Sequence, residues 1–134
     1  MTDTQTLPTD PQALAEAVAA AMWSRDRAAQ ALGIRIEAVG PGTATLSMKV
    51  RGDMVNGHHI CHGGLIFSLA DTAFAYACNA YNRNTVASGC NIDFVAPGKE
   101  GETLTAEAAE RVALLPRGDT LTGHTHHRAR RSLA

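Results

Sequence analysis

The chain has 134 residues, of which 45% are hydrophobic and 19% are charged. This length is typical of one domain, and the composition is sufficient for a globular core, which argues against disorder along the whole chain. The formal net charge of -1, without interleaved aromatic and basic residues, argues against a nucleic-acid-binding protein. The N-terminus has no signal-peptide character and no run of transmembrane length, so we expect a cytoplasmic protein that does not bind membranes. An odd number of cysteines, three, favours free thiols over a disulfide framework.

The predicted elements begin with a helix that follows a polar, disordered segment, residues 1–9. Asp10 and Pro11 are typical of an N-cap and a first helical position, and apolar residues at helical spacing continue to Gly33, with a break near residues 23–26. Alternating apolar residues from 34 to 50 then predict a β-hairpin with one buried face. The remaining predictions are a polar loop over 51–62, a long buried helix over 63–79, and strands over 85–95 and 102–115.

The last segment, residues 116–134, differs from the rest in composition. It is basic and rich in histidine, and it lacks the alternation of a strand. We therefore expect one folded domain over residues 10–115 and a solvated tail after it, with a metal or anion site in the tail as the weaker alternative.

Asp71 lies in the middle of the long apolar helix, on a polar stripe with Ser68 and Thr72. A helix that is apolar on most sides is expected to be buried, and an ionised carboxylate there needs hydrogen-bond partners or a pocket that water can reach. Asp71 is therefore either a structural residue bonded to Ser68 or a nearby loop, or a functional carboxylate.

The loop before this helix contains Asn56 and His62 and ends in Gly63 and Gly64. Unpaired backbone N–H groups and the positive end of the helix dipole are found where a helix begins. Glycine also lets a substrate carbonyl approach the backbone closely, so this position could form an oxyanion hole. The alternative is a plain tight turn, with His62 bonded to a backbone carbonyl.

These residues together resemble a known family. The chain is similar, from about residue 22 to about residue 110, to the hotdog-fold thioesterases of phenylacetic acid degradation. The segments that carry the resemblance are Asn56-Gly57, His62-Gly63-Gly64, residues 67–76, Val86-Ala87-Ser88, Ile92-Asp93-Phe94 and Pro97-Gly98.

The resemblance implies an α+β hotdog fold, in which a curved antiparallel sheet wraps around the long helix. It implies that Asp71 acts as general base or nucleophile, that the Gly63 N–H polarises the thioester carbonyl, and that Asn56 and His62 place the carbonyl, the water or the loop. Some relatives also use a serine, which matches Ser88 or, if the register shifts by one, the Ala87 position. The implied substrate is an acyl-CoA thioester such as hydroxylated phenylacetyl-CoA, with no cofactor. The implied assembly is a homodimer or a dimer of dimers. Because the unusual tail lacks strand alternation, we expect the C-terminal strands that normally close this fold to be incomplete.

Three other interpretations stay open. His58, His59, Cys61 and His62 include good zinc ligands, although adjacent residues of an extended loop point in different directions. A dehydratase or hydratase uses the same fold but would typically pair a histidine with the helix acid. The third is a non-catalytic acyl-CoA binding module, because fold alone does not define function.

Overall fold

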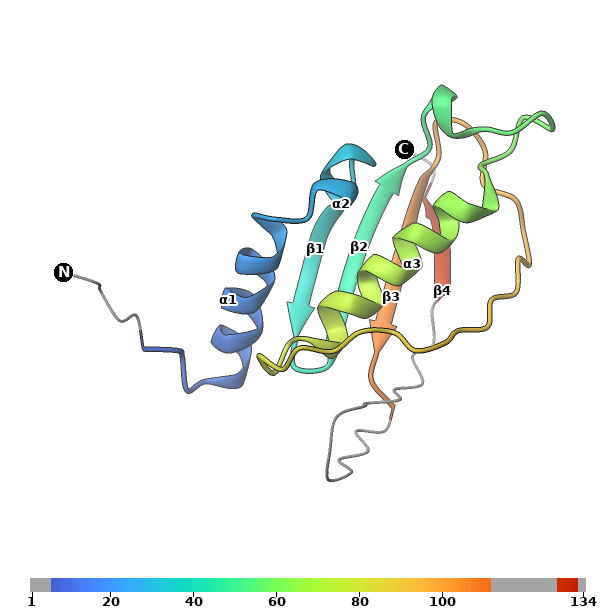
Figure 1. Ribbon diagram of the computed structural model, residues 1–134. Helices are drawn as coiled ribbons and strands as arrows, with labels where there is room; N and C mark the ends of the chain where they lie inside the picture. The colour runs from blue at the N-terminus through green and yellow to red at the C-terminus, as the bar shows by residue number, and fades with distance from the viewer. Residues whose placement is uncertain (1–5, 112–127, 133–134) are drawn as a thin grey trace.

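A four-stranded antiparallel sheet in the order β1-β2-β3-β4 carries one long helix, α3, on one of its faces (Figure 1). The computed structural model describes residues 6–111 and 128–132. The elements, in chain order, are α1 (Pro11–Trp23), α2 (Arg27–Ala31), β1 (Arg35–Gly40), β2 (Thr43–Lys49), the short 3-10 helix η1 (Gly52–Met54), α3 (Gly63–Cys78), β3 (Thr103–Ala109) and β4 (Arg128–Ser132). The predicted α+β class, with an N-terminal helix and a central helix on an antiparallel sheet, is confirmed.

The two N-terminal helices begin where the sequence predicts. Asp10 caps α1 by accepting a hydrogen bond from the Ala13 N–H at 2.8 Å, and Asp26 caps α2 in the same way through Ala29 at 3.1 Å. Such caps satisfy N–H groups that have no partner inside the helix. The predicted break near residues 23–26 is therefore the end of α1 followed by the cap of α2, and Gly33, at φ +67°, ends the helical region.

The core lies between α3 and the sheet. Leu46, Met48 and Val50 point from β2 and its end toward the helix and are at most 1% exposed. Leu69 and Ala73 are buried on the facing side of α3. Burying a side chain of the size of leucine or methionine contributes about 1.5–3 kcal/mol, so this layer holds α3 against β2 and β3.

The predicted strand over residues 85–95 is wrong for the single chain. These residues form no strand; the segment instead takes the chain from the end of α3 back toward its beginning (Figure 1). Val86 is 82% exposed and Val95 is 93% exposed. The hydrophobic residues favour a strand locally, but none of the four strands pairs with this segment, and a strand needs a neighbour for its backbone hydrogen bonds.

The other predicted strand is shorter than expected, since β3 spans Thr103–Ala109. Residues 112–115 of that prediction, and the tail histidines 124, 126 and 127, lie outside the described residues. Part of the tail differs from its prediction, because β4 (Arg128–Ser132) pairs with β3 although its sequence does not alternate. In the described ranges, no helix has the length and apolar character needed to cross a membrane.

Candidate active site

A hairpin-like loop leads into α3 and is closed by Asn56. The Asn56 N–H donates to the Ile60 carbonyl at 2.8 Å, and the Asn56 Oδ1 accepts from the backbone N–H of His58 at 2.9 Å and of Ile60 at 3.4 Å. His59 has φ +59°, a left-handed conformation that is uncommon for a residue with a side chain. The side-chain oxygen of Asn56 thus holds the loop in shape.

His62 is the N-cap of α3. Its Nδ1 accepts a hydrogen bond from the Gly64 N–H at 3.1 Å, and its carbonyl accepts from the Leu65 N–H at 2.9 Å. Among the described residues, no acceptor is assigned to the Gly63 N–H. Since the following N–H groups of the first turn are occupied, Gly63 presents the donor that is free to bind a ligand.

Gly63 also touches the extended segment that follows α3. A Cβ placed on Gly63 would lie 3.1 Å from Cζ of Phe94, closer than normal van der Waals contact. Phe94 itself is 56% exposed. The ring therefore stands against the beginning of α3, where a side chain at residue 63 would push it aside.

Asp71 lies on the face of α3 that points away from the sheet, and its side chain is exposed. The expectation that the whole helix, and with it Asp71, is buried was wrong for the single chain, because the sheet covers only one face of α3. Ser68 donates to the Gly64 carbonyl at 2.8 Å, and Thr72 donates to the Ser68 carbonyl at 2.7 Å. Both hydroxyls are used by the helix backbone, so neither holds Asp71. Within residues 6–111, no hydrogen bond or ion pair is assigned to its carboxylate.

Gly63 and Asp71 are separated along a single helix. They are eight positions apart in α3, which corresponds to about 12 Å along the axis at 1.5 Å per residue. A thioester carbonyl needs its oxyanion donor within about 3 Å while the attacking group is a similar distance from its carbon. One α3 helix does not bring these two groups together.

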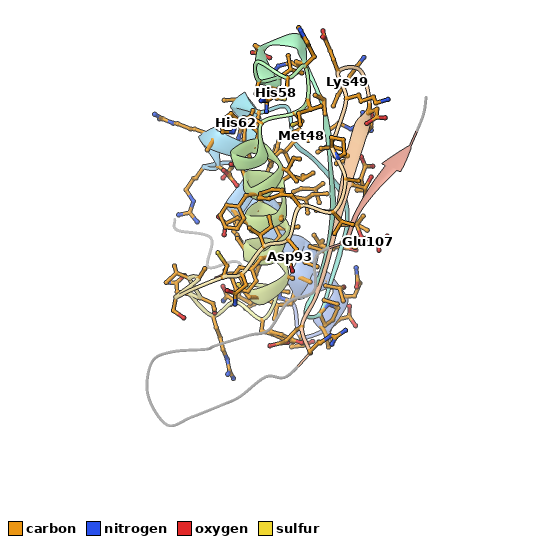
Figure 2. All side chains as sticks on the ribbon, turned by 90° about the vertical axis from the view of Figure 1, so that its right-hand side faces the viewer. Met48, Lys49, His58, His62, Asp93 and Glu107 are labelled. Atoms are coloured by element: carbon orange, nitrogen blue, oxygen red, sulfur yellow. The ribbon has the colours of Figure 1, made fainter. Side chains whose placement is uncertain are left out.

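The predicted serine position, Ser88 or Ala87, lies in a different segment from the loop and helix that carry the other predicted residues. Ser88 and its neighbour Ala87 are both exposed in the segment that forms no strand, and no hydrogen bond is assigned between either residue and Gly63 or Asp71. His62 is seen beside α3 near the top of Figure 2, with His58 beyond it and Asp93 on the segment that passes the helix. The structure therefore brings Asn56, His62 and Gly63 together but not Ser88.

Cys78, at the end of α3, is one of the free cysteines of the chain. It is seven positions after Asp71 and so lies on the same face of α3, two turns away. Burial, above all, raises the pKa of its thiol to about 11, and the carboxylates of Glu110 and Asp71 act in the same direction. Because the thiolate is the nucleophilic form of cysteine, Cys78 is protonated and unreactive near neutral pH.

The residues of the possible zinc site do not converge. His58 and His59 are exposed at the tip of the loop, whereas Cys61 is 3% exposed. Burial also raises the pKa of the Cys61 thiol. In the part of the chain that is described, no group of three or more histidine, cysteine or acidic side chains is arranged to hold a metal ion.

Comparison with known proteins identifies the family. Residues 58–110 match the thioesterase superfamily. Over 91 residues the chain is 55% identical to the acyl-coenzyme A thioesterase PaaI of Escherichia coli, a match that covers 68% of this chain and 65% of that protein. A putative esterase of Archaeoglobus fulgidus is 39% identical over 89 residues, 66% of this chain and 58% of that protein. The match thus spans 65% and 58% of the length of these two curated relatives, less than two thirds of each.

Solved structures agree with this result over a larger part of the chain. The E. coli PaaI protein from the phenylacetic acid degradation operon superimposes with a TM-score of 0.83 and 44% identity, covering 91% of this chain and 85% of that one. A variant of the phenylacetic acid degradation protein PaaI from Thermus thermophilus gives a TM-score of 0.69 and 33% identity, covering 81% and 90%. This chain belongs to the thioesterase superfamily and has its hotdog fold.

Proposed function

We propose that the protein hydrolyses acyl-CoA thioesters to the free acid and CoA. The observation that supports this function best is the hydrogen bonding of α3. Its first turn and its exposed face use Gly64, Ser68 and Thr72 internally, and leave the Gly63 N–H and the Asp71 carboxylate without an assigned partner in the described chain. One oxyanion donor and one base or nucleophile are sufficient for an electrophilic thioester.

In this mechanism the thioester oxygen lies against the Gly63 N–H. Asp71, as a general base, removes a proton from water while the water oxygen attacks the carbonyl carbon. The negative charge that develops on the carbonyl oxygen is stabilised by the Gly63 N–H. The C–S bond then breaks, and the CoA thiolate leaves and takes up a proton. If Asp71 is instead the nucleophile, its carboxylate attacks the carbon, CoA leaves, and water hydrolyses the resulting anhydride.

The site is proposed to be shared between two chains. Because Gly63 and Asp71 are about 12 Å apart on one helix, an antiparallel pair of α3 helices in a homodimer would place Gly63 of one chain beside Asp71 of the other. The exposed apolar side chains of residues 86–95, among them Phe94 and Val95, also favour association, because they have little to pack against in one chain. A dimer, or a dimer of such dimers, is therefore the proposed active form.

The proposed acyl group is aryl-acetyl, with hydroxylated phenylacetyl-CoA as the first candidate, because two similar structures are those of phenylacetic acid degradation proteins. We place the protein in the cytoplasm, where its three free thiols would stay reduced. The test is release of free thiol from a panel of acyl-CoAs. Binding without release would favour the acyl-CoA binding module, and hydration of an enoyl-CoA without release would favour the hydratase. The Nδ1 of His62, the histidine at this helix, is already engaged in the cap, which weakens the hydratase reading.

The mechanism assigns no role to a metal. Turnover is expected to survive prolonged treatment with a chelator, because the base is Asp71 and the oxyanion donor is a backbone group. Activity is measured before and after dialysis against EDTA. Loss of activity that zinc restores would favour the cluster of His58, His59, Cys61 and His62 instead.

A further inference from the structure

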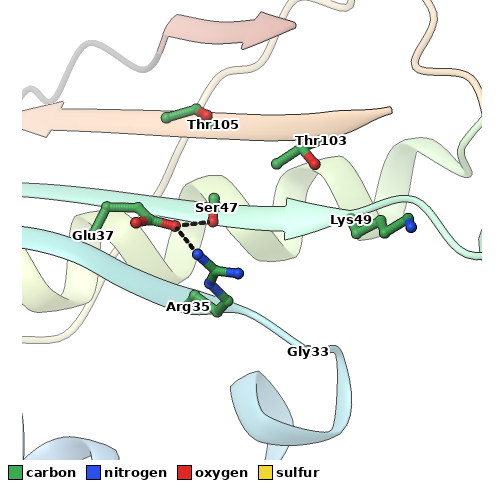
Figure 3. A pocket seen from close by; sticks show the side chains of 7 residues that line it. All are labelled: Gly33, Arg35, Glu37, Ser47, Lys49, Thr103 and Thr105. Carbon is green, nitrogen blue, oxygen red and sulfur yellow. Dashed lines mark hydrogen bonds and ion pairs between the residues drawn. The ribbon is translucent and has the colours of Figure 1, made fainter. Parts of the chain in front are cut away.

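A pocket lies on the other face of the sheet, away from α3. A pocket of about 390 Å³ is lined by Gly33, Arg35, Glu37, Ser47, Lys49, Thr103 and Thr105. In the close view α3 lies behind the sheet, so the sheet separates this pocket from Gly63 and Asp71 (Figure 3). The pocket is therefore no part of the proposed hydrolytic site, and an acyl-CoA bound at Gly63 and Asp71 would leave the pocket empty.

The pocket is built by neighbouring strands in register. Ser47 pairs with Thr105 and Lys49 pairs with Thr103 across β2 and β3, while Arg35 pairs with Ser47 from β1. Side chains of paired residues lie on the same face of a sheet. Three hydroxyl groups and two cations therefore converge on one surface, and no aliphatic or aromatic side chain lines it.

Glu37 gives this surface its internal order. It sits where the pairing of β1 and β2 is irregular, between Ile36 and Ala38. Its Oε1 accepts from the Ser47 hydroxyl at 2.5 Å and from the Arg35 guanidinium at 3.4 Å. Ser47 is only 6% exposed, so Glu37 both satisfies a buried hydroxyl and offsets the charge of Arg35.

Lys49 then supplies an unbalanced positive charge. Among the described residues no carboxylate forms an ion pair with its ammonium group. Thr103 and Thr105 offer hydroxyl donors next to it, and the β3–β4 register places Arg130 opposite Thr105.

We infer that this outer pocket binds a compact phosphate group, as inorganic phosphate or as a small phosphomonoester. A phosphate has several acceptor oxygens and can bond to donors from two strands at once, and lysine and arginine are its usual partners in proteins. An acyl chain does not suit this lining, because no aliphatic or aromatic residue contributes to it. A ligand on this face is bound independently of thioester hydrolysis.

The test is an NMR titration of the full chain with inorganic phosphate and, separately, with methyl phosphate, with sodium chloride at matched ionic strength as reference. Saturable shifts of the Ser47, Lys49, Thr103 and Thr105 amides are expected. Lys49→Ala should raise the dissociation constant about tenfold or more, because it removes the unpaired cation. Lys99→Ala, which removes an exposed lysine outside the pocket, should leave it unchanged.

Glu37→Gln should change the dissociation constant for phosphate in the opposite direction to Lys49→Ala. Glutamine still accepts the Ser47 hydrogen bond but removes the negative charge, so the dissociation constant should fall several-fold. In the wild-type chain, tighter binding of inorganic phosphate than of methyl phosphate identifies the free ion as the ligand. Tighter binding of methyl phosphate than of inorganic phosphate identifies a phosphomonoester. Equal shifts with chloride, or equal binding by Lys49→Ala and wild type, would overturn the proposal. These readouts do not depend on hydrolysis, so they stand or fall separately from the proposed function.

Discussion

The loop that leads into α3 is held by its own hydrogen bonds, whereas the segment that follows α3 is exposed. Residues 54–62 are fixed from within: the Asn56 side chain closes the loop, and His62 accepts the Gly64 N–H. Residues 86–97 are mostly exposed and include Val86 and Val95, at 82% and 93%. One chain is therefore enough to fix the helix entry that holds the Gly63 N–H, the proposed oxyanion donor, whereas the apolar segment and Asp71 face outward.

The largest expected effect concerns the outward-facing carboxylate. Asp71→Asn keeps the size of the side chain but removes the base, so turnover should fall by roughly 10² to 10⁴. Because Asp71 is exposed and has no assigned partner, the free energy of unfolding should change little. The measurements are steady-state thiol release and urea denaturation. Unchanged turnover in this variant would remove Asp71 from the mechanism.

A mixing experiment tests whether the two regions work across chains. Asp71→Asn and Asn56→Ala chains are purified, shown to be nearly inactive alone, and mixed under conditions that exchange subunits. In a heterodimer of the shared-site type, one site carries both changes and the other carries neither. Random pairing should therefore restore roughly a quarter of wild-type activity.

The control for this experiment is the amount of heterodimer, measured by native mass spectrometry with one chain isotopically labelled. If heterodimers form and no activity returns, both halves of the site come from one chain. The loop and Asp71 would then have to approach each other by a rearrangement of α3.

The cap of α3 is expected to have a smaller effect. His62→Ala removes the acceptor of the Gly64 N–H, which should cost about 1 kcal/mol of stability and lower turnover about tenfold as the first turn loosens. His62→Asn should recover most of both, because asparagine is among the best N-cap residues. If His62→Asn recovers stability but not turnover, the imidazole itself contacts the substrate.

The smallest effect is expected where the two regions meet. Gly63→Ala would place its Cβ 3.1 Å from the Phe94 ring, and because this ring is half exposed and can shift, the loss of stability should stay below about 1 kcal/mol. In a Phe94→Ala background the loss should disappear. Gly64→Ala is the matched control, since its nearest neighbour, His62 Nδ1, is 3.4 Å from the new Cβ.

These stabilities are compared by urea denaturation at one protein concentration, because association shifts the apparent value. An equal loss for Gly63→Ala with and without Phe94 would show that the ring does not rest on Gly63 in solution.

Much of the fold follows from local sequence. Asp10 and Pro11 define the start of α1, and alternation over residues 43–50 defines β2 and its buried face, because capping and side-chain periodicity depend on near neighbours. The apolar run after Gly63 likewise predicts α3. The pattern of this helix and of the loop before it indicated Asn56, His62, Gly63 and Asp71 as candidates, and the resemblance to a family supplied their expected roles, which stay predictions.

Other features were decided only by the tertiary structure. The apolar pattern of residues 85–95 favours a strand, but whether a strand forms depends on a neighbour to pair with, and none of the described strands pairs with this segment. The composition of α3 suggested burial of Asp71, yet the sheet covers only one face of the helix. The strand β4 and the outer pocket beside Ser47 also depend on register and on contacts between distant segments. Sequence periodicity determines which face of an element is apolar, but the arrangement of the elements determines what covers that face.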